Sequence, residues 1–138
     1  MKGKILIDTN ILIYLFSNTE PKKQTVCQEL IAKLSNESEL VWSTQVVQEF
    51  CYNLIGKRQQ KTAFVKKALS LFSSFELVVN DLMIIENAMD IQLRNQLSFW
   101  DSLIISSAVS AKCSYLLSED LQHSQKIEGV EIVNPFLI

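Results

Sequence analysis

The chain has 138 residues, of which 48% are hydrophobic and 20% are charged, and its formal net charge is −2. These values are typical of a single globular α/β domain spanning residues 1–138, and they exclude a strongly basic surface over the whole molecule. No apolar stretch approaches the roughly 20 residues that cross a bilayer, and the first one is interrupted at Asp8. We therefore expect no membrane association, no signal peptide and a cytoplasmic protein.

Short apolar runs and amphipathic segments alternate along the sequence. We predict strands at residues 4–7, 40–42, 75–79, 115–117 and 130–133. We predict helices at residues 11–16, 21–34, 44–55, 63–72, 81–95 and 99–112, and a helical turn at 121–126. Strands that alternate with helices predict an α/β fold with a mostly parallel sheet and helices on both of its faces.

Helical spacing also predicts which side chains are buried. In the second helix the buried stripe is expected at Val26, Leu30, Ile31 and Leu34. In the third helix it is expected at Val46, Val47, Phe50, Cys51 and Leu54. The expected helix caps are Ser43 or Thr44, Asn80 and Ser98.

The cysteines and the single histidine limit the possible chemistry. Cys27, Cys51 and Cys113 are far apart and each lies among apolar residues, so we interpret them as core thiols. His123 is the only histidine, which excludes a histidine-rich metal site. Any site for a hard metal ion must therefore be built from carboxylates.

Two aspartates follow predicted strands. Asp8 comes directly after the first strand, at the kind of position where open α/β sheets build their ligand sites. Thr9 and Asn10 follow it, so this segment could equally serve as the cap of the next helix. Asp120 has a similar context, because an aliphatic strand and the hydroxyl residue Ser118 precede it.

Two further acids lie in predicted helices. Asp101 is in the first turn of a helix that is otherwise almost uncharged, and stabilisation of the helix dipole is its alternative role. Glu49 shares a helix face with Gln45 and borders the buried stripe, but alone it would be interpreted as a solvated glutamate. Considered together with the three aspartates, it completes a set of four acids.

Four carboxylates gathered in one place would repel one another, and burial would raise their pKa values. A divalent hard cation, Mg²⁺ or Mn²⁺, removes this conflict because it takes oxygen ligands and commonly meets a substrate phosphate. Such a site activates water for phosphodiester hydrolysis without a catalytic serine, histidine or cysteine.

Several segments, in this order and spacing, resemble those of a known family. They are Ile5–Asn10, Ser43–Phe50, Leu97–Ile105 and Leu116–Asp120, and the ending Gly129–Pro135 is also typical. On these segments the chain resembles PIN-domain ribonucleases, in particular the small VapC-like toxins of toxin–antitoxin modules.

The resemblance implies that the four acids converge at one edge of the sheet and bind Mg²⁺ or Mn²⁺; they are Asp8, Glu49, Asp101 and Asp120. Asp8 and Asp101 would be the firmest metal ligands, whereas Glu49 and Asp120 would bind the metal directly or through water.

The neighbours of these acids also have implied roles. Thr9 and Asn10 would orient the Asp8 carboxylate, and Ser118 would support the site in a similar way. The spacing from Ser118 favours Asp120 over the adjacent Glu119 as the acid that faces the metal. His123 could contact a phosphate near the site, or it could face solvent in a loop.

The leading hypothesis is therefore a Mg²⁺/Mn²⁺-dependent endoribonuclease that acts as a toxin and leaves 5′-phosphate and 3′-hydroxyl ends. Single-stranded or loop RNA is the favoured substrate, because proteins reach unpaired bases and exposed backbone most easily. The resemblance also implies a homodimer and a small antitoxin protein that inserts a cation into the acidic pocket.

Other functions are weighed against this one. A phosphatase of the haloacid-dehalogenase type is disfavoured, because that chemistry needs an aspartate where Asn10 stands. A housekeeping PIN nuclease and a catalytically silent PIN module that binds RNA or protein remain as alternatives. The presence of all four acids favours catalysis.

One basic segment stands out against the near-neutral total. Its cations are Lys57, Arg58, Lys61, Lys66 and Lys67, with no acid between them. The segment could contact RNA phosphates beside the acidic site, or it could be an ordinary solvated helix face.

Overall fold

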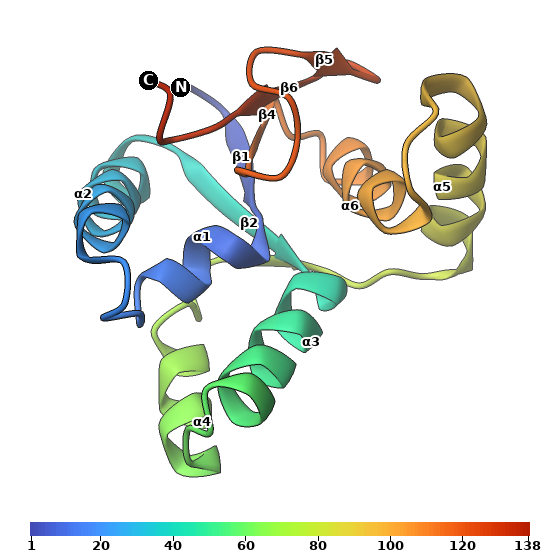
Figure 1. The fold of residues 1–138 in the computed structure, drawn as a ribbon. Coiled ribbons are helices and arrows are strands. Elements are labelled where there is room, and N and C mark those ends of the chain that lie inside the picture. Colours follow the sequence, from blue (N-terminus) through green and yellow to red (C-terminus); the bar gives the residue numbers. More distant parts are fainter.

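The computed structural model describes all residues from Met1 to Ile138, with a central sheet between layers of helices (Figure 1). The strands are β1 (Lys4–Ile7), β2 (Glu39–Ser43), β3 (Glu76–Val78), β4 (Tyr115–Leu117), β5 (Lys126–Ile127) and β6 (Val130–Val133). The helices are α1 (Thr9–Tyr14), α2 (Pro21–Glu37), α3 (Thr44–Tyr52), α4 (Thr62–Ser70), α5 (Leu82–Asn95) and α6 (Phe99–Ser110). One π-helical turn, η1 (Asn53–Lys57), continues α3.

The six strands form one sheet in the order β3-β2-β1-β4-β6-β5. Every neighbouring pair is parallel except β5 and β6, which are antiparallel. Leu6 of β1 is paired with Val41 of β2 on one side and with Leu116 of β4 on the other. β1, β2 and β4 are therefore adjacent, and their carboxyl ends open at the same edge of the sheet. The predicted α/β fold with a mostly parallel sheet is confirmed.

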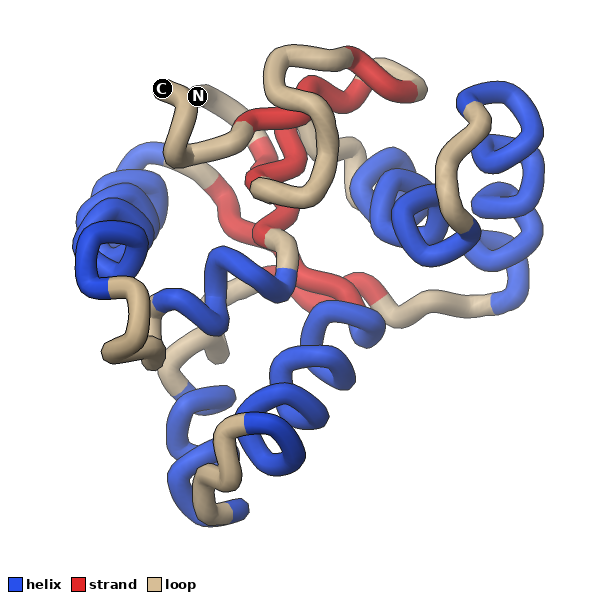
Figure 2. Tube along the Cα trace, in the orientation of Figure 1, coloured by secondary structure: helices blue, strands red, loops and turns tan.

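Helices cover the sheet on both faces. Figure 1 shows α1 and α2 on one side of the strands and α5 and α6 on the other, and Figure 2 shows the strands in red between them. The segment Ser102–Ala108 of α6 is buried at every position, which explains why its sequence carries no charge. α3 and α4 extend together beyond the end of the sheet (Figure 1).

An aromatic cluster, defined by Phe16, Trp42, Phe50 and Phe72, joins α3 and α4 to the sheet. The ring centroid of Phe50 lies 5.8 Å from that of Phe16 and 6.0 Å from that of Phe72, and both pairs are edge-on. Trp42 of β2 packs in the same way against Phe72, at 5.4 Å. Edge-to-face pairs of this kind contribute about 0.5–1.5 kcal/mol each beyond the burial of their area. The cluster therefore stabilises the position of α3 relative to β2.

The predicted helical turn at 121–126 is wrong. The segment is a loop that ends in β5, and a turn at Glu128 and Gly129 with φ of 52° and 84° returns the chain to β6. Two consecutive residues with positive φ are typical of a two-residue hairpin turn, because this geometry matches the twist of the strands. Ser124 N–H also donates to the Ile132 carbonyl oxygen (2.8 Å), and Ile132 N–H donates to the Gln125 carbonyl oxygen (2.8 Å), so the loop is bonded to β6.

The predicted stripe of α2 is wrong at its start. Cys27 is buried together with Ile31 and Leu34, whereas Val26 is 37% exposed. Positions 27, 31 and 34 lie on one helical face, so the burial of the last two determines that Cys27 rather than Val26 faces the sheet. In α3, Val46 and Phe50 are buried as expected, but Val47 and Cys51 are only half-buried.

Two of the predicted helix caps are confirmed. The hydroxyl groups of Ser43 and Ser98 accept hydrogen bonds from the backbone N–H groups of Val46 and Asp101. The expected cap Asn80 is wrong, because Asp81 accepts from Ile84 N–H (2.9 Å) instead. The Asn80 side chain accepts a hydrogen bond from Ser107, so it connects the loop before α5 to α6 instead.

The three cysteines are free thiols, as expected. Cys27 and Cys113 are buried, and burial raises the pKa of each thiol to about 12, which keeps both protonated near neutral pH. No helix combines the length and the apolar character that crossing a membrane requires.

Candidate functional site

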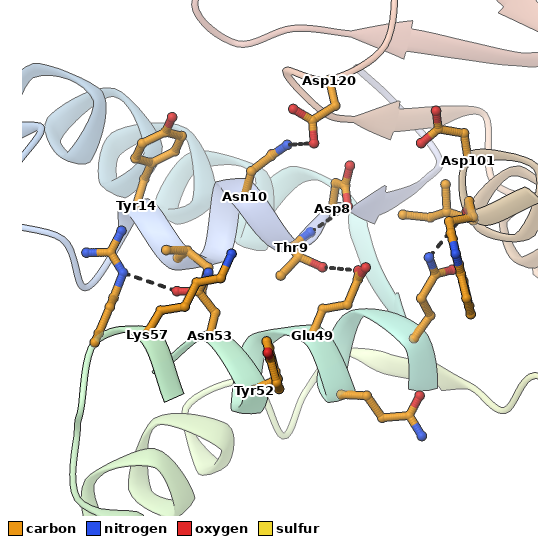
Figure 3. Close-up of a pocket in the computed structure, with 16 residues that line it drawn as sticks. Asp8, Thr9, Asn10, Tyr14, Glu49, Tyr52, Asn53, Lys57, Asp101 and Asp120 are labelled. Carbon is orange, nitrogen blue, oxygen red and sulfur yellow. Dashed lines mark hydrogen bonds between the residues drawn. The ribbon is translucent and has the colours of Figure 1, made fainter. Parts of the chain in front are cut away.

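Four carboxylates from separate parts of the chain line one pocket at the carboxyl ends of the central strands (Figure 3). Asp8 follows β1, Asp120 lies in the loop after β4, Glu49 is on α3 and Asp101 is in the first turn of α6. The pocket has a volume of about 760 Å³. The structure thus brings together the four acids that the sequence singled out.

Asp8 is the most tightly held of the four. Its Oδ2 accepts a hydrogen bond from the Ser118 hydroxyl (2.6 Å), and its Oδ1 accepts from Thr9 N–H (2.7 Å). The second contact makes Asp8 the cap of α1, which begins at Thr9, two residues earlier than predicted. The cap and the site are therefore not alternatives, because the same carboxylate serves both.

The environment of Asp8 disfavours its ionised form. Burial raises the pKa of Asp8 from 3.8 to about 6, and the charges of Asp120 and Glu49 act in the same direction. The hydrogen bonds from Ser118 and Thr9 oppose this effect and lower the pKa. A carboxylate with such a pKa is stabilised by any cation that enters the pocket.

Two of the other acids, Glu49 and Asp120, accept hydrogen bonds from the first turn of α1. Thr9 Oγ1 donates to Glu49 (2.8 Å), and Asn10 Nδ2 donates to Asp120 (2.9 Å). Asn10 was expected to orient Asp8, but its side chain donates to Asp120; it is the second residue of α1, two positions beyond the cap Asp8. Asp101 is held through its backbone, whose N–H donates to Ser98.

The expected convergence of the acids on one point is not present in these side-chain conformations. No three acidic, histidine or cysteine side chains of the chain are grouped closely enough to hold a metal ion. The reason is visible in Figure 3, where Glu49 turns to Thr9 and Asp120 turns to Asn10. The donor chemistry nevertheless fits a hard cation, since the ionisable acids of the pocket offer oxygen ligands and it contains no histidine or cysteine.

The sequence profile of the PIN domain family matches residues 5–128. The chain belongs to the PIN domain family. This confirms the family that the sequence segments indicated. No curated protein sequence matches the chain.

Solved structures share the fold of this PIN domain. A toxin–antitoxin complex from Klebsiella pneumoniae contains a chain with 21% identity and a TM-score of 0.72, over 95% of this chain and 97% of that one. VapBC2 from Rickettsia felis, bound to a promoter DNA fragment, contains a chain with 16% identity and a TM-score of 0.70, over 94% of this chain and 96% of that one. VapC20 from Mycobacterium tuberculosis, a sarcin-ricin loop cleaving toxin, has 18% identity and a TM-score of 0.67, over 84% of this chain and 91% of that one.

In this PIN domain, Glu119 points away from the pocket that Asp120 lines. Its carboxylate forms an ion pair with Lys23 (2.8 Å) and accepts a hydrogen bond from the Tyr14 hydroxyl. Lys23 also lies over the ring of Phe136, 4.9 Å from its centroid. These contacts connect the loop after β4 to α1 and α2. The side chains of Glu119 and Asp120 therefore point in different directions.

The basic segment of the PIN domain is divided between two places. Lys57 and Arg58 line the acidic pocket, whereas Lys61, Lys66 and Lys67 do not. Arg58 is oriented by donation to Asn53 and Ser17, both at 3.2 Å. The part of the segment that can meet a ligand in the pocket is therefore its first two residues.

His123 does not line the pocket. Its Nδ1 accepts a hydrogen bond from Asn134 N–H (3.0 Å), so the ring ties the loop before β5 to the segment after β6.

Sequence reasoning missed several residues that line the pocket of the PIN domain. They include Gln45, Tyr52 and Trp100. Each had a local signal: Gln45 and Tyr52 lie one turn before and after Glu49 on α3, and Trp100 precedes Asp101. Gln45 is only 7% exposed and donates to the Trp100 carbonyl oxygen (3.3 Å), which connects α3 to α6.

The raised pKa of Asp8 predicts that this group destabilises the folded state at neutral pH. Because its folded pKa lies above the unfolded value of 3.8, its favourable contribution is complete below pH 3.8 and is lost as the pH rises through about 6. The complete loss should be about 3 kcal/mol, from the size of the shift, and about 2 kcal/mol of it should fall between about pH 4.5 and about pH 7.5. Urea unfolding of the parent and of Asp8→Asn at about pH 4.5 and about pH 7.5 measures it. A difference between the two proteins that does not change with pH would contradict this account.

Proposed function

We propose that this PIN domain is a Mg²⁺- or Mn²⁺-dependent endoribonuclease. The observation that carries the proposal is that Asp8, Glu49, Asp101 and Asp120 line one pocket at the carboxyl ends of parallel strands. When bound there, the cation supplies an activated water and offsets charge at the attacked phosphate. The oxygen-only acid set and the raised pKa of Asp8 support the presence of such an ion.

The residues of the pocket would have different roles in binding the cation. Asp8 and Asp101 would hold the ion directly, and Glu49 and Asp120 would hold it directly or through water. Glu49 and Asp120 are exposed and can exchange their hydrogen bonds with Thr9 and Asn10 for the cation. Ser118 would keep Asp8 in position, since it donates to the carboxylate oxygen that Thr9 does not contact.

The biological role in this proposal is that of the toxin in a toxin–antitoxin module. Its support is the similarity in fold to chains of a toxin–antitoxin complex, of VapBC2 and of VapC20. A small antitoxin would restrain the enzyme by placing an arginine or lysine among the carboxylates, where it competes with the metal. Homodimerisation in the cytoplasm completes this proposal, on the strength of the family resemblance alone.

Cleavage of a mixed tRNA pool tests the proposal directly. We expect cleavage that requires added Mg²⁺ or Mn²⁺, stops in EDTA and leaves 5′-phosphate ends. Calorimetric titration with Mn²⁺ should show binding to the same protein. RNA binding without metal binding or cleavage would instead favour a catalytically silent PIN module.

Lys57 and Arg58 should contribute to RNA affinity, and the other cations of the basic segment should contribute less. Lys57→Gln is expected to reduce the slope of log K against log salt by about 0.7, because one phosphate contact to a single strand is lost. Lys66→Gln is the matched control, since Lys66 is also exposed but does not line the pocket. Salt-dependent binding of single-stranded RNA measures both slopes. An equal reduction in the two variants would show that the whole basic segment binds RNA.

A further inference from the structure

The two most exposed aromatic side chains of the protein both line the acidic pocket. Tyr52 is 71% exposed and Trp100 is 62% exposed. Other aromatic side chains are packed, and even Phe64, which is 42% exposed, contacts the ring of Phe16 at 5.9 Å. Single exposed apolar residues are ordinary, but two exposed rings that line the same pocket offer a ligand flat apolar surface beside the acids.

Each ring is placed next to a different acid. Tyr52 is one turn beyond Glu49 on α3, and Figure 3 shows it beside Glu49. Trp100 directly precedes Asp101 on α6, and its ring packs edge-on against Phe99 at 5.2 Å. The backbone of Trp100 is held by the Gln45 amide of α3, so the two walls that carry the rings are connected. The helices that carry the two rings are therefore connected beside the acids before any ligand arrives.

We infer that Tyr52 and Trp100 are stacking platforms for unpaired RNA bases on either side of the phosphate that the acids address. This inference rests on the proposed function and adds the form of the substrate. Aromatic rings beside cations are the usual combination in proteins that bind single strands, and Lys57 and Arg58 line the same pocket.

Stacking on these platforms selects against paired RNA, because the bases of a duplex are already stacked on one another. Tyr52 is the last residue of α3, whereas the backbone of Trp100 is bonded to Gln45 near the start of α3. Bases that remain stacked in a duplex strand are separated by only about 3.4 Å. A base can stack on either ring only after it leaves its neighbours, which an unpaired strand permits at low cost and a duplex resists. The platforms therefore favour loops and single strands.

Binding is measured with Asp8→Asn, which prevents cleavage, and a random-sequence single-stranded RNA pool of about 12 nucleotides. In this background, Trp100→Ala and Tyr52→Ala should each weaken binding by roughly 5- to 150-fold, whereas Trp100→Phe and Tyr52→Phe should retain most of it. The slope against salt should stay unchanged in all four, because no phosphate contact is removed. Leu93→Ala is the control: Leu93 is 81% exposed on α5 and does not line the pocket.

Intrinsic fluorescence reports the stacking itself. The chain has two tryptophans, and Trp42 is only 7% exposed. Addition of the RNA pool should therefore quench Trp100 selectively, and Trp100→Phe should abolish the quenching while it preserves binding. The same pool annealed to its complement should bind more weakly than the single strands. Trp100→Ala and Tyr52→Ala should reduce this difference in affinity between single-stranded and duplex RNA.

The outcomes separate this inference from the proposed function. If the parent cleaves RNA but Trp100→Ala and Tyr52→Ala bind the single strands as tightly as the Asp8→Asn protein, the platforms are refuted and the nuclease stands. The two rings would then be candidates for contact with a protein partner. If the parent neither binds nor cleaves RNA, the proposed function fails and this inference fails with it.

Discussion

Asp8→Asn is expected to lower metal-dependent RNA cleavage by more than about 100-fold. Loss of a residue that merely supports a metal ligand typically costs 10- to 100-fold, and Asp8 is proposed as a ligand itself. The substitution preserves the size of the side chain and removes the charge on which the proposed cation depends. Initial rates of cleavage at saturating Mn²⁺, together with Mn²⁺ calorimetry, measure the effect.

The same variant should remain folded, which makes the loss of activity interpretable. Asp8 is ionised at neutral pH at a cost to the folded state, because its pKa is raised to about 6 by burial. Asparagine removes this cost, although it can accept only one of the two hydrogen bonds from Ser118 and Thr9. Asp90→Asn, an exposed substitution on α5, is the control and should leave both rate and melting temperature unchanged. Undiminished cleavage by Asp8→Asn would refute the assignment of the acidic pocket as the catalytic site.

Phe50→Ala is expected to have the largest effect on stability, about 3–5 kcal/mol. Phe50 is fully buried on α3 and packs edge-on against Phe16 and Phe72, so its removal leaves a cavity and deletes two aromatic pairs. Urea unfolding measures the change. Leu93→Ala, on an exposed face of α5, should change stability by less than about 0.5 kcal/mol.

Phe50→Ala also tests how the fold supports the site. Glu49 directly precedes Phe50 on α3 and Tyr52 follows two residues later, and the aromatic cluster stabilises the position of that helix. Under conditions where the variant is still folded, we expect weaker Mn²⁺ binding. A loss below about 1 kcal/mol would show that the surrounding rings close the cavity.

In the proposed toxin, binding of a cation in the acidic pocket should raise the free energy of unfolding. The pocket raises the pKa of Asp8, mainly through burial and also through the charges of Asp120 and Glu49. Any cation that enters should therefore stabilise the fold by mass action as well as through local contacts. A metal ion and a basic side chain from an antitoxin would both stabilise the fold in this way, and they would compete for the same pocket.

The order of strands and helices could be predicted because each element carries its own periodicity. β1, β2, β4 and β6 were located to within one residue, and the ends of α5 and α6 within two. The hairpin of β5 could not be predicted. Its two residues are too few to show a pattern, and their pairing with β6 is a contact between segments.

The four acids could be chosen from the sequence because each stands at a boundary that local pattern reveals or matches a family segment. Their hydrogen bonds could not be predicted. Asn10 contacts Asp120 across 110 positions of sequence, and the pairing of Glu119 with Lys23 spans 96. The platforms Tyr52 and Trp100 were missed for the same reason, since exposure of an aromatic ring is decided by what packs over it.

By itself, the sequence determined the α/β class, the PIN-family segments and the identity of the acids. The class depends on periodicity within short stretches, where neighbours in sequence are also neighbours in space, and the set of acids depends also on the resemblance of short segments to the family. Only the tertiary structure decided that Lys57 and Arg58 share the pocket with the acids and that Glu119 turns away from it. It also decided that Gln45 connects α3 to α6. Such contacts depend on the order of strands in the sheet and the crossing of helices, which bring distant residues together in ways that no local pattern records.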